Sequence, residues 1–201
     1  MNSRVILSGI LIAGVLGLLT GCHFYHTKHG NGHVVSRERS VSDFDGVVLK
    51  GVGDVNIRHD DNFRVVVKTD SNIQEIIDVY VDDDTLYIDE RNRGGFDPTE
   101  LTINVYMPEL KSIKLKGVGD ITASGGKTGN LDIKLSGVGN VDTRNYEAEN
   151  VKVDLSGVGD IKVWVTEKLT GDLSGIGDVR YKGNPSTINV DRDGIGHIKK
   201  L

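Results

Sequence analysis

The 201-residue sequence predicts an all-β protein, folded as a single-domain right-handed parallel β-helix (β-solenoid) with rungs of about 20 residues. Three observations support this fold class: a short glycine motif recurs at a nearly fixed period, apolar and polar residues alternate around it, and the chain contains 26 glycines. Self-similarity at such a period is typical of repeat architectures. The same observations name neither a reaction nor a ligand.

The recurring motif is Gly-[Val/Ile]-Gly followed by Asp, Asn or His. From the second copy on, successive copies begin 20, 20, 18 and 19 residues apart. The six copies are Gly51–Asp54, Gly117–Asp120, Gly137–Asn140, Gly157–Asp160, Gly175–Asp178 and Gly194–His197. Because glycine accepts a positive φ without a Cβ clash, we interpret each copy as a corner between two strands.

The residues that flank each corner alternate between apolar and polar, which indicates strands with one buried face. In the fourth copy Leu155 and Ile161 share one parity, whereas Val158 at the corner does not. If all three face inward, the backbone must turn at Val158. Stacked repeats would place equivalent residues beside each other, about 4.8 Å apart. The alternative is an antiparallel sandwich or barrel, whose strands have no reason to repeat side-chain identity column by column.

Composition narrows the function. Hydrophobic residues make up 37% and aromatic residues 5% of the chain, which suits a thin aliphatic core. The net charge of −5 argues against a nucleic-acid partner, because such proteins carry a basic face. No glycine motif continues to Gly-x-Gly-x-x-Gly or to the Gly-Lys-Ser/Thr ending of a P-loop, so no nucleotide or other cofactor is expected.

Residues 1–22 are interpreted as a lipoprotein signal peptide. An uncharged, mostly apolar run from Val5 to Leu19 follows Arg4 and is short for a membrane-spanning helix. It ends in Leu19-Thr20-Gly21-Cys22, which resembles the lipobox of bacterial lipoproteins, so we expect Cys22 to be acylated and to anchor the chain to a membrane. By the same resemblance, His23 favours the outer membrane. The alternative is an ordinary signal peptide with an incidental cysteine.

Residues 23–40 are polar and are expected to form a flexible tether. They contain four histidines, which suit a transition-metal site: His23, His26, His29 and His33. A polar linker without metal is the alternative that we favour, since a flexible segment has no preorganised ligand geometry.

Residues 41–201 are expected to form the solenoid domain. The spacing of Ser71, Gln74 and Ile77 predicts a helix of one or two turns, and Asp82-Asp83-Asp84 predicts a turn between two strands. Residues 58–110 interrupt the repeat. At the far end Arg192 and Lys200 replace apolar residues, and charge there discourages end-to-end addition.

The repeats, the segment Val105-Tyr106-Met107-Pro108-Glu109-Leu110 and the lipoprotein-like start together resemble the bacterial family of auto-transporter adhesin, head GIN domains. The resemblance covers about residues 41–200 and implies a β-helical fold. It supplies no catalytic residues, and fold alone does not fix function.

In most copies the residue after the corner carries a carboxylate or an amide: Asp54, Asp120, Asn140, Asp160 and Asp178. Gly-x-Gly-x-Asp is similar to calcium-binding nonapeptide repeats, but those recur every nine residues. Adjacent carboxylates repel, and Asn140 separates two of them. We therefore favour a structural role, in which each side chain accepts a backbone N–H of its own corner.

Trp164 is the only tryptophan and is predicted to point outward between Val163 and Val165. We favour a surface ladder with cation–π contacts, since a single exposed aromatic residue needs no explanation; the alternative is a contact surface for a glycan or a protein, for which Trp164 is the best candidate. The expected basic residues around it are Arg144 and Lys182 beside the ring, and Lys162 and Arg180 in the adjoining column.

The sequence thus predicts an envelope lipoprotein, on the outer membrane and facing the periplasm or the cell surface, that acts as a non-enzymatic structural or adhesive binding module. No catalytic residues stand out. The expected partners are the membrane, through the lipid, and an envelope protein or surface glycan. The alternatives are a β-solenoid enzyme that acts on polysaccharide and an envelope protein–protein interaction factor.

Overall fold

The computed structural model describes residues 27–91 and 95–201, which are all-β. Cys22 and the rest of the predicted signal peptide lie outside these residues. No helix in the described ranges could cross a membrane. The described strands are β1 (Lys28–His29), β2 (Val34–Arg39), β3 (Gly46–Leu49), β4 (Asp54–His59), β5 (Arg64–Asp70), β6 (Ile77–Asp82), β7 (Thr85–Glu90), β8 (Phe96–Asp97), β9 (Leu101–Met107), β10 (Ser112–Leu115), β11 (Ile121–Leu135), β12 (Val141–Leu155), β13 (Ile161–Leu173), β14 (Val179–Lys182), β15 (Thr187–Arg192) and β16 (Ile198–Lys200).

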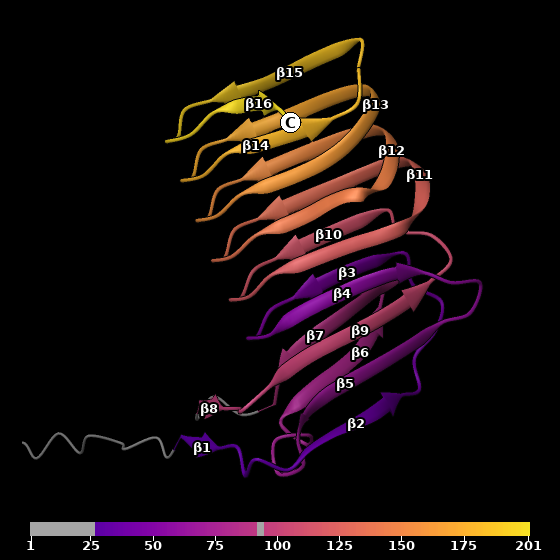
Figure 1. The fold of residues 1–201 in the computed structure, drawn as a ribbon, viewed down its shortest axis with the longest axis vertical. Coiled ribbons are helices and arrows are strands. Elements are labelled where there is room, and N and C mark those ends of the chain that lie inside the picture. Colours follow the sequence, from indigo (N-terminus) through magenta and orange to yellow (C-terminus); the bar gives the residue numbers. More distant parts are fainter. Residues whose placement is uncertain (1–26, 92–94) are drawn as a thin grey trace, which may run out of the picture.

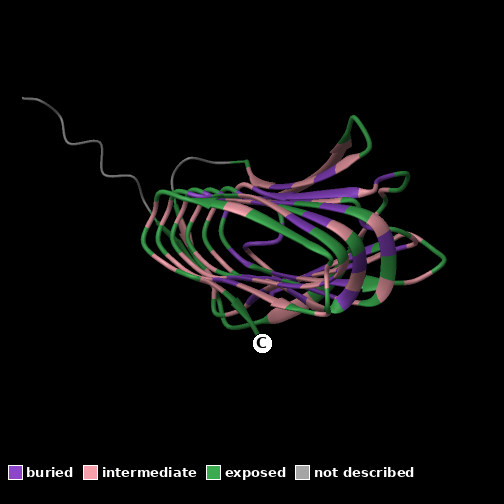
Figure 2. Ribbon diagram, turned by 90° about the horizontal axis from the view of Figure 1, so that it is seen from above, coloured by how far each residue is buried: buried purple, intermediate pink, exposed green. Residues whose placement is uncertain are grey.

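The larger sheet has 14 of the described strands and forms two facing layers around the core (Figures 1 and 2). One layer consists of parallel neighbours in the order β7, β3, β10, the second halves of β11, β12 and β13, and β15. The other consists of parallel neighbours in the order β9, β4, the first halves of β11, β12 and β13, β14 and β16. Each repeat therefore contributes one strand segment to each layer, and we call this pair a level.

The glycine motifs join the two layers along one edge. Equivalent corner residues form parallel bridges between adjacent levels, among them Val138 with Val158, as the column alignment predicts. The backbones approach closely: a Cβ on Gly139 would lie 1.9 Å from the carbonyl oxygen of Gly119. Gly139 also has a φ of +133°, so both its space and its conformation require glycine.

The corner side chains face solvent, which corrects the expectation that they point inward. Val138 is 50% exposed, while Leu135 and Val141 on either side of the corner are fully buried. The reason is that these two side chains already fill the core at the corner, so the apex residue between two glycines projects away from it. We call the resulting row the apolar ridge: Val52, Val118, Val138, Val158, Ile176 and Ile195, with exposed fractions of 45–71%.

The N-terminal half is mixed rather than wholly parallel. Strands β2, β5 and β9 pair antiparallel, and β6 and β7 form an antiparallel hairpin. The hairpin turn carries Asp83 and Asp84 at positive φ, as expected for the acidic turn. The antiparallel strands pack beside β7 and β9, so they close the first end of the parallel stack (Figure 1).

The helix expected around residues 71–77 is wrong. Residues 71–76 form turns, in which the Gln74 N–H donates to the Asp70 carbonyl at 3.1 Å, and Ile77 already begins β6. The Gln74 side chain is buried and donates to the carbonyls of Val35 and Val67 at 2.9 and 3.0 Å. Those bonds tie the segment to β2 and β5, and it has no room for a second helical turn.

The sheet begins before residue 41, so residues 23–40 are not a tether over their whole length. Strand β2 pairs with β5 from Val34↔Asp70 to Arg39↔Val65. The buried carboxylate of Asp70 holds this start in place, because it accepts the Gly32 N–H at 2.7 Å and the Thr99 N–H at 2.7 Å. Burial alone would raise the pKa of Asp70, but the donors from Thr99 and Gly32 hold it below its ordinary value.

Candidate functional site

Trp164 lies on the outer face of β13, between the fully buried Val163 and Val165, as predicted. Lys182 is its register partner on β14, and the lysine Nζ lies 3.7 Å from the centroid of the indole ring. This contact is a cation–π interaction. The predicted pairing of Trp164 with Lys182 is therefore confirmed.

The neighbour of Trp164 on β12 is Glu147 and not Arg144, which corrects the expected surface. The register moves from Thr143↔Val163 directly to Glu147↔Trp164, so residues 144–146 bulge out of the pairing. Glu147 in turn pairs with Lys127 on β11. Four side chains thus form a row across β11 to β14, which we call the Trp164 row: Lys127, Glu147, Trp164 and Lys182.

Two residues of the bulge explain why it forms. Arg144 turns back to Asp142, with its Nη2 2.6 Å from Oδ2 and its Nε 2.9 Å from Oδ1. Burial would raise the pKa of Asp142, but the hydrogen bonds from Arg144 hold it below its ordinary value. Tyr146 turns inward, and its buried hydroxyl accepts the Leu110 N–H at 2.9 Å. Burial raises the pKa of this hydroxyl.

A surface hollow of about 650 Å³ lies beside Trp164. Its lining combines the indole with an amide, a carboxylate, an ammonium group and an imidazole: His59, Gly125, Gly126, Lys127, Asn145, Glu147 and Trp164. A Cβ on Gly126 would lie 2.4 Å from Cε2 of Tyr146, so the floor of the hollow requires glycine. His59 Nδ1 lies 2.8 Å from the Pro108 carbonyl oxygen and donates to it, since a carbonyl only accepts.

This arrangement suits a ligand with an apolar face and several hydroxyl or amide groups. Binding sites commonly combine an aromatic wall with a few fixed polar groups. Asn145 and Glu147 supply acceptors, and Lys127 supplies donors. Lys182 does not line the hollow. The indole therefore contacts an ammonium group outside the hollow and is itself part of the hollow's wall.

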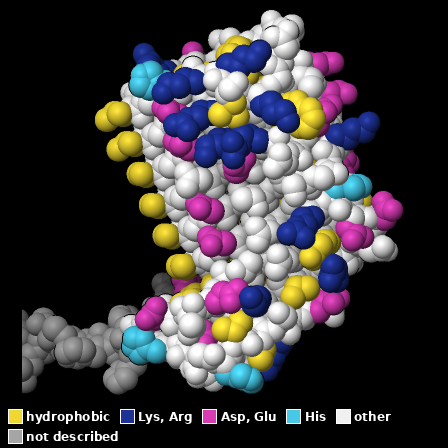
Figure 3. Space-filling view, in the orientation of Figure 1, with side chains coloured by type: hydrophobic (Ala, Val, Ile, Leu, Met, Phe, Trp, Pro, Cys, Tyr) yellow, Lys and Arg dark blue, Asp and Glu magenta, His cyan; other side chains and the backbone are white. Residues whose placement is uncertain are grey.

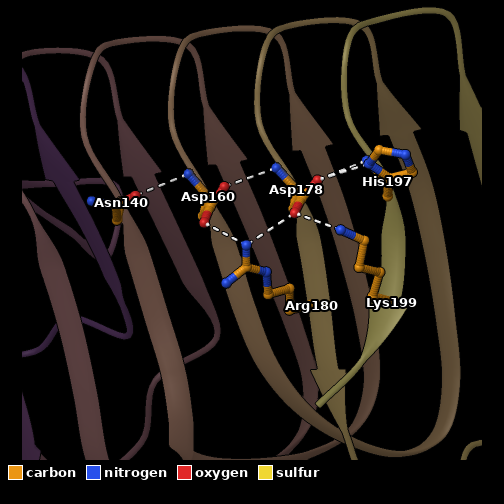
Figure 4. Close-up of polar contacts among 6 residues, drawn as sticks. All are labelled: Asn140, Asp160, Asp178, Arg180, His197 and Lys199. Carbon is orange, nitrogen blue, oxygen red and sulfur yellow. Dashed lines mark hydrogen bonds and ion pairs between the residues drawn. The ribbon is translucent and has the colours of Figure 1, made fainter.

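In the adjoining column Arg180 belongs to an ion-pair network and is not part of a free basic patch. Arg180 lies 3.0 Å from Asp178 and 3.5 Å from Asp160, and Lys199 lies 3.2 Å from Asp178 (Figure 4). The hydrogen bond from Arg180, with those from His197 and Lys199, holds the pKa of Asp178 well below its usual range. Lys162 is in register with Asp142 on one side and Arg180 on the other.

The acidic column forms a hydrogen-bond ladder along the corners. Each Oδ1 accepts the N–H of the equivalent residue one level on, at 2.8–3.0 Å, and not that of its own corner as expected (Figure 4). The ladder runs through Asp54, Asp120, Asn140, Asp160, Asp178 and His197. Since one oxygen of each acceptor already binds a backbone N–H, the geometry supports a structural role.

Comparison with known families identifies the family to which the repeat region belongs. A family model described as "Putative auto-transporter adhesin, head GIN domain" matches residues 43–125 and 114–185. The chain belongs to the head GIN domain family. This confirms the resemblance carried by the repeats, and the head GIN domain spans most of the described residues.

A solved structure shares the fold of this head GIN domain. A "putative adhesin" from Bacteroides fragilis has a TM-score of 0.61 at 24% identity and covers 86% of this chain and 99% of that chain. A "putative adhesin" from Parabacteroides merdae gives 0.44 at 17% identity, with 86% and 98% covered. A "putative lipid binding protein" from Parabacteroides distasonis gives 0.40 at 20% identity, with the same coverage. No curated protein matches the chain significantly.

The predicted metal site lies partly outside the described part of the head GIN domain. His23 and His26 are not among the described residues, and neither is Cys22. His29 lies on β1, with its Nδ1 3.2 Å from Asp97 Oδ2, and His33 lies in the turn before β2. Within residues 27–91 and 95–201, no three His, Cys, Asp or Glu side chains lie together as a metal site would need.

Sequence reasoning found Trp164 but missed the rest of the hollow. His59 lies on β4, whereas Asn145 and Glu147 lie on β12, and none of the three belongs to the glycine motif. One signal was present: copies three and four begin 20 residues apart, but copies four and five only 18. The two extra residues must bulge somewhere in this level. They are the net result of a three-residue bulge on β12 at 144–146 and one extra residue on β13 between Val165 and Lys168, and the bulge places Glu147 where a simple count places Arg144.

Proposed function

We propose that this protein is a lipid-anchored, non-enzymatic binding module of the bacterial envelope, built as a right-handed parallel β-helix. The parallel pairing of six successive corners supports the β-helix. The leader that ends in Leu19-Thr20-Gly21-Cys22 supports the lipid anchor. Membership of a family described as adhesins supports a binding role at the envelope.

The observation that carries the binding role is the Trp164 hollow. It is an open, aromatic-walled cavity of about 650 Å³ on the outside of a rigid stack. Its fixed donors and acceptors match a saccharide, whose rings have one less polar face and many hydroxyls. We infer that the ligand is a surface or envelope glycan that lies against Trp164 and is held by Glu147, Asn145 and Lys127.

The same hollow argues against a glycan-cleaving enzyme. Most glycoside hydrolases use two carboxyl groups that flank the scissile bond, about 5 to 9.5 Å apart. Glu147 is the sole carboxylate among the described residues that line the hollow. A single carboxylate can bind a sugar hydroxyl, but it cannot supply both the acid and the base or nucleophile of that mechanism.

The test uses Trp164 as its own reporter, since it is the only tryptophan of the chain. Purified full chain is titrated with host surface glycans and bacterial envelope polysaccharides while the intrinsic fluorescence is recorded. We expect a saturable change in emission, weakened binding in Glu147→Gln, and loss of binding in Trp164→Ala when it is measured by calorimetry.

A matched control removes another outward aromatic. Tyr106 has the Arg64 guanidinium 3.9 Å from its ring centroid, so Tyr106→Ala deletes a similar cation–π pair outside the hollow. Tyr106→Ala should bind as the wild type does. No saturable change with any glycan would refute the saccharide site, and release of shortened saccharides would instead indicate the enzyme.

The anchor is tested separately. Mass spectrometry of membrane-extracted protein should find acyl chains on Cys22, and Cys22→Ser should move the protein to the soluble fraction. An unmodified mature protein that is freely soluble would contradict the lipoprotein. Because the hollow lies on the stack and not on the leader, this result would leave the glycan test unaffected.

A further inference from the structure

The apolar ridge is a regular row of exposed aliphatic side chains. Its branched side chains form a line along the corner edge of the stack (Figure 3). The levels are bridged at each ridge residue, so the row is continuous from Val52 to Ile195. Single exposed aliphatic residues are normal on protein surfaces, but contiguous rows with polar borders mark interaction sites.

The fold itself does not require these side chains. The backbone bonds of the corner, such as Val138 N–H to the Gly117 carbonyl at 3.0 Å, involve no side-chain atom of the ridge. A polar residue at the apex could make the same bonds and would face the same solvent. The repeated choice of valine or isoleucine therefore points to a contact outside the chain.

The two flanks of the ridge differ in charge. One flank consists of the residue directly before each motif. From the second copy of the motif on, these residues are all exposed: Lys116, Ser136, Ser156, Ser174 and Asp193. The other flank holds the residues that end each motif, which form the acidic ladder: Asp54, Asp120, Asn140, Asp160, Asp178 and His197. The ridge thus separates a mainly neutral flank, basic at one end and acidic at the other, from a mainly acidic flank.

We propose that the apolar ridge binds the ridge of a second copy of this chain, side by side and parallel, about a two-fold axis that runs along the stack. This rotation places the first flank of one copy opposite the second flank of the other, level by level. Lys116 then faces the partner copy's Asp120, and Asp193 faces its His197. The serines face Asn140, Asp160 and Asp178, so no level brings like charges together.

The antiparallel arrangement is disfavoured by the same charges. It would place the two acidic flanks against each other in reverse order, with Asp120 opposite the partner copy's Asp178. A bilayer is also a poor occupant, because the acidic ladder borders the ridge along its length. Anionic lipid headgroups would be repelled by that ladder.

The parallel pair suits a protein held at one membrane. Strands β1 and β2 lie at the first end of the stack (Figure 1), so in a parallel pair these strands of both copies would lie at the same end. A row one residue wide makes a small contact, at the low end for specific interfaces. Co-anchoring raises the effective concentration of the two copies. The pairing agrees with the proposed anchor but does not rest on it.

The test is disulfide trapping in the full chain in native membranes. Val118→Cys, Val138→Cys and Ile176→Cys are made singly and oxidised with copper phenanthroline. A parallel two-fold pair places each ridge residue beside the same residue of the partner copy. All three variants should therefore give covalent dimers at similar yield. The wild type, which has Cys22 alone, measures the background, and Lys152→Cys on an exposed site away from the corners is the matched negative control.

Two results would overturn the proposal. Cross-linking at Val138→Cys but at neither Val118→Cys nor Ile176→Cys would indicate an antiparallel pair. Yields at all three that equal Lys152→Cys would show that the ridge faces lipid or another protein. As an independent check, Val118→Thr with Val138→Thr should reduce trapping at Ile176→Cys because two apolar contacts of the ridge are lost, while the thermal unfolding midpoint stays near that of the wild type, because both sites are solvent-exposed and no charge is added.

Discussion

Replacing Gly139 with alanine should strongly destabilise the stack, because the new methyl group has no space between two levels. The Cβ would lie 1.9 Å from the Gly119 carbonyl oxygen and 2.7 Å from its carbon. Ordinary carbon–oxygen contacts are about 3.3 Å or longer, so the two corners must move apart by more than 1 Å, roughly. Neighbouring side chains cannot give way here, because the atoms in contact are backbone.

The magnitude follows from the bonds that this movement breaks. The Val138 N–H donates to the Gly117 carbonyl at 3.0 Å, and the Gly119 N–H donates to the Val138 carbonyl at 3.0 Å. Each such bond contributes about 1 kcal/mol. The φ of +133° costs an alanine about 1–3 kcal/mol more. The free energy of unfolding should therefore fall by about 3–5 kcal/mol, which lowers the midpoint by roughly 10 °C in a domain of this size.

The assay is thermal unfolding followed by circular dichroism and calorimetry, with Gly129→Ala as the matched control. Gly129 lies in β11, and a Cβ there would meet nothing closer than Glu149 Oε2 at 3.8 Å. Gly129→Ala should unfold within about 2 °C of the wild type, since only the backbone entropy of the unfolded chain changes appreciably. If Gly139→Ala melts within that same window, the close packing of the corners is refuted.

Three further predictions concern polar groups. Asp70→Asn should destabilise the protein at pH 7. Because the folded-state pKa of Asp70 is depressed, the ionised carboxylate contributes to the free energy of unfolding above about pH 4, and this contribution is lost as the pH falls. The unfolding midpoints of variant and wild type should therefore converge in acid. Equal differences at pH 7 and pH 3 would contradict this. Thr69→Val should raise the free energy of unfolding by about 1 kcal/mol, because the buried Thr69 hydroxyl has no partner among the described residues; a lower midpoint would reveal a missed partner. Asn140→Asp should lower stability in low salt and recover in high salt, since it removes the amide donor to Asp120 and adds a third adjacent carboxylate; a loss independent of salt would exclude charge repulsion.

The sequence predicted the parts of the fold that repeat. Residues of the predicted inward columns, such as Val153 and Leu155, are buried, and the corners of successive copies pair in parallel. Strand alternation and glycine spacing are local properties, so both are visible in one chain. The level formed by β7 and β9 was invisible, because the sequence between these strands, residues 91–100, contains no Gly-[Val/Ile]-Gly motif. Its place beneath β3 and β4 is set by tertiary pairing.

The candidate site was predicted only where its residues follow the regular alternation of the strands. Parity alone placed Trp164 outward and Lys182 beside it, since both lie in regularly paired segments. Parity also held at Val158, which has the opposite parity to the buried Leu155 and Ile161 and faces solvent; the expectation that all three face inward was wrong. Parity failed at Arg144, where a bulge shifts the register. Of the two surfaces for which we propose a partner, the ridge therefore follows the regular alternation, whereas the hollow depends on a local irregularity.

The hydrogen-bond ladder explains which residues the corner column accepts. At each level the column has to supply an oxygen to a backbone N–H of the next level, and a negative charge is not needed for that bond. Asn140 meets this requirement as well as its acidic neighbours do: its Oδ1 accepts the Asp160 N–H at 3.0 Å, and its Nδ2 donates to Asp120 Oδ1 at 3.0 Å. A calcium column would select carboxylates at every level, whereas an acceptor column selects Asp or Asn. The mixture is what the ladder predicts, and the remaining charge on its outer oxygens is then available to Arg180 and Lys199 or, across the ridge, to a second copy.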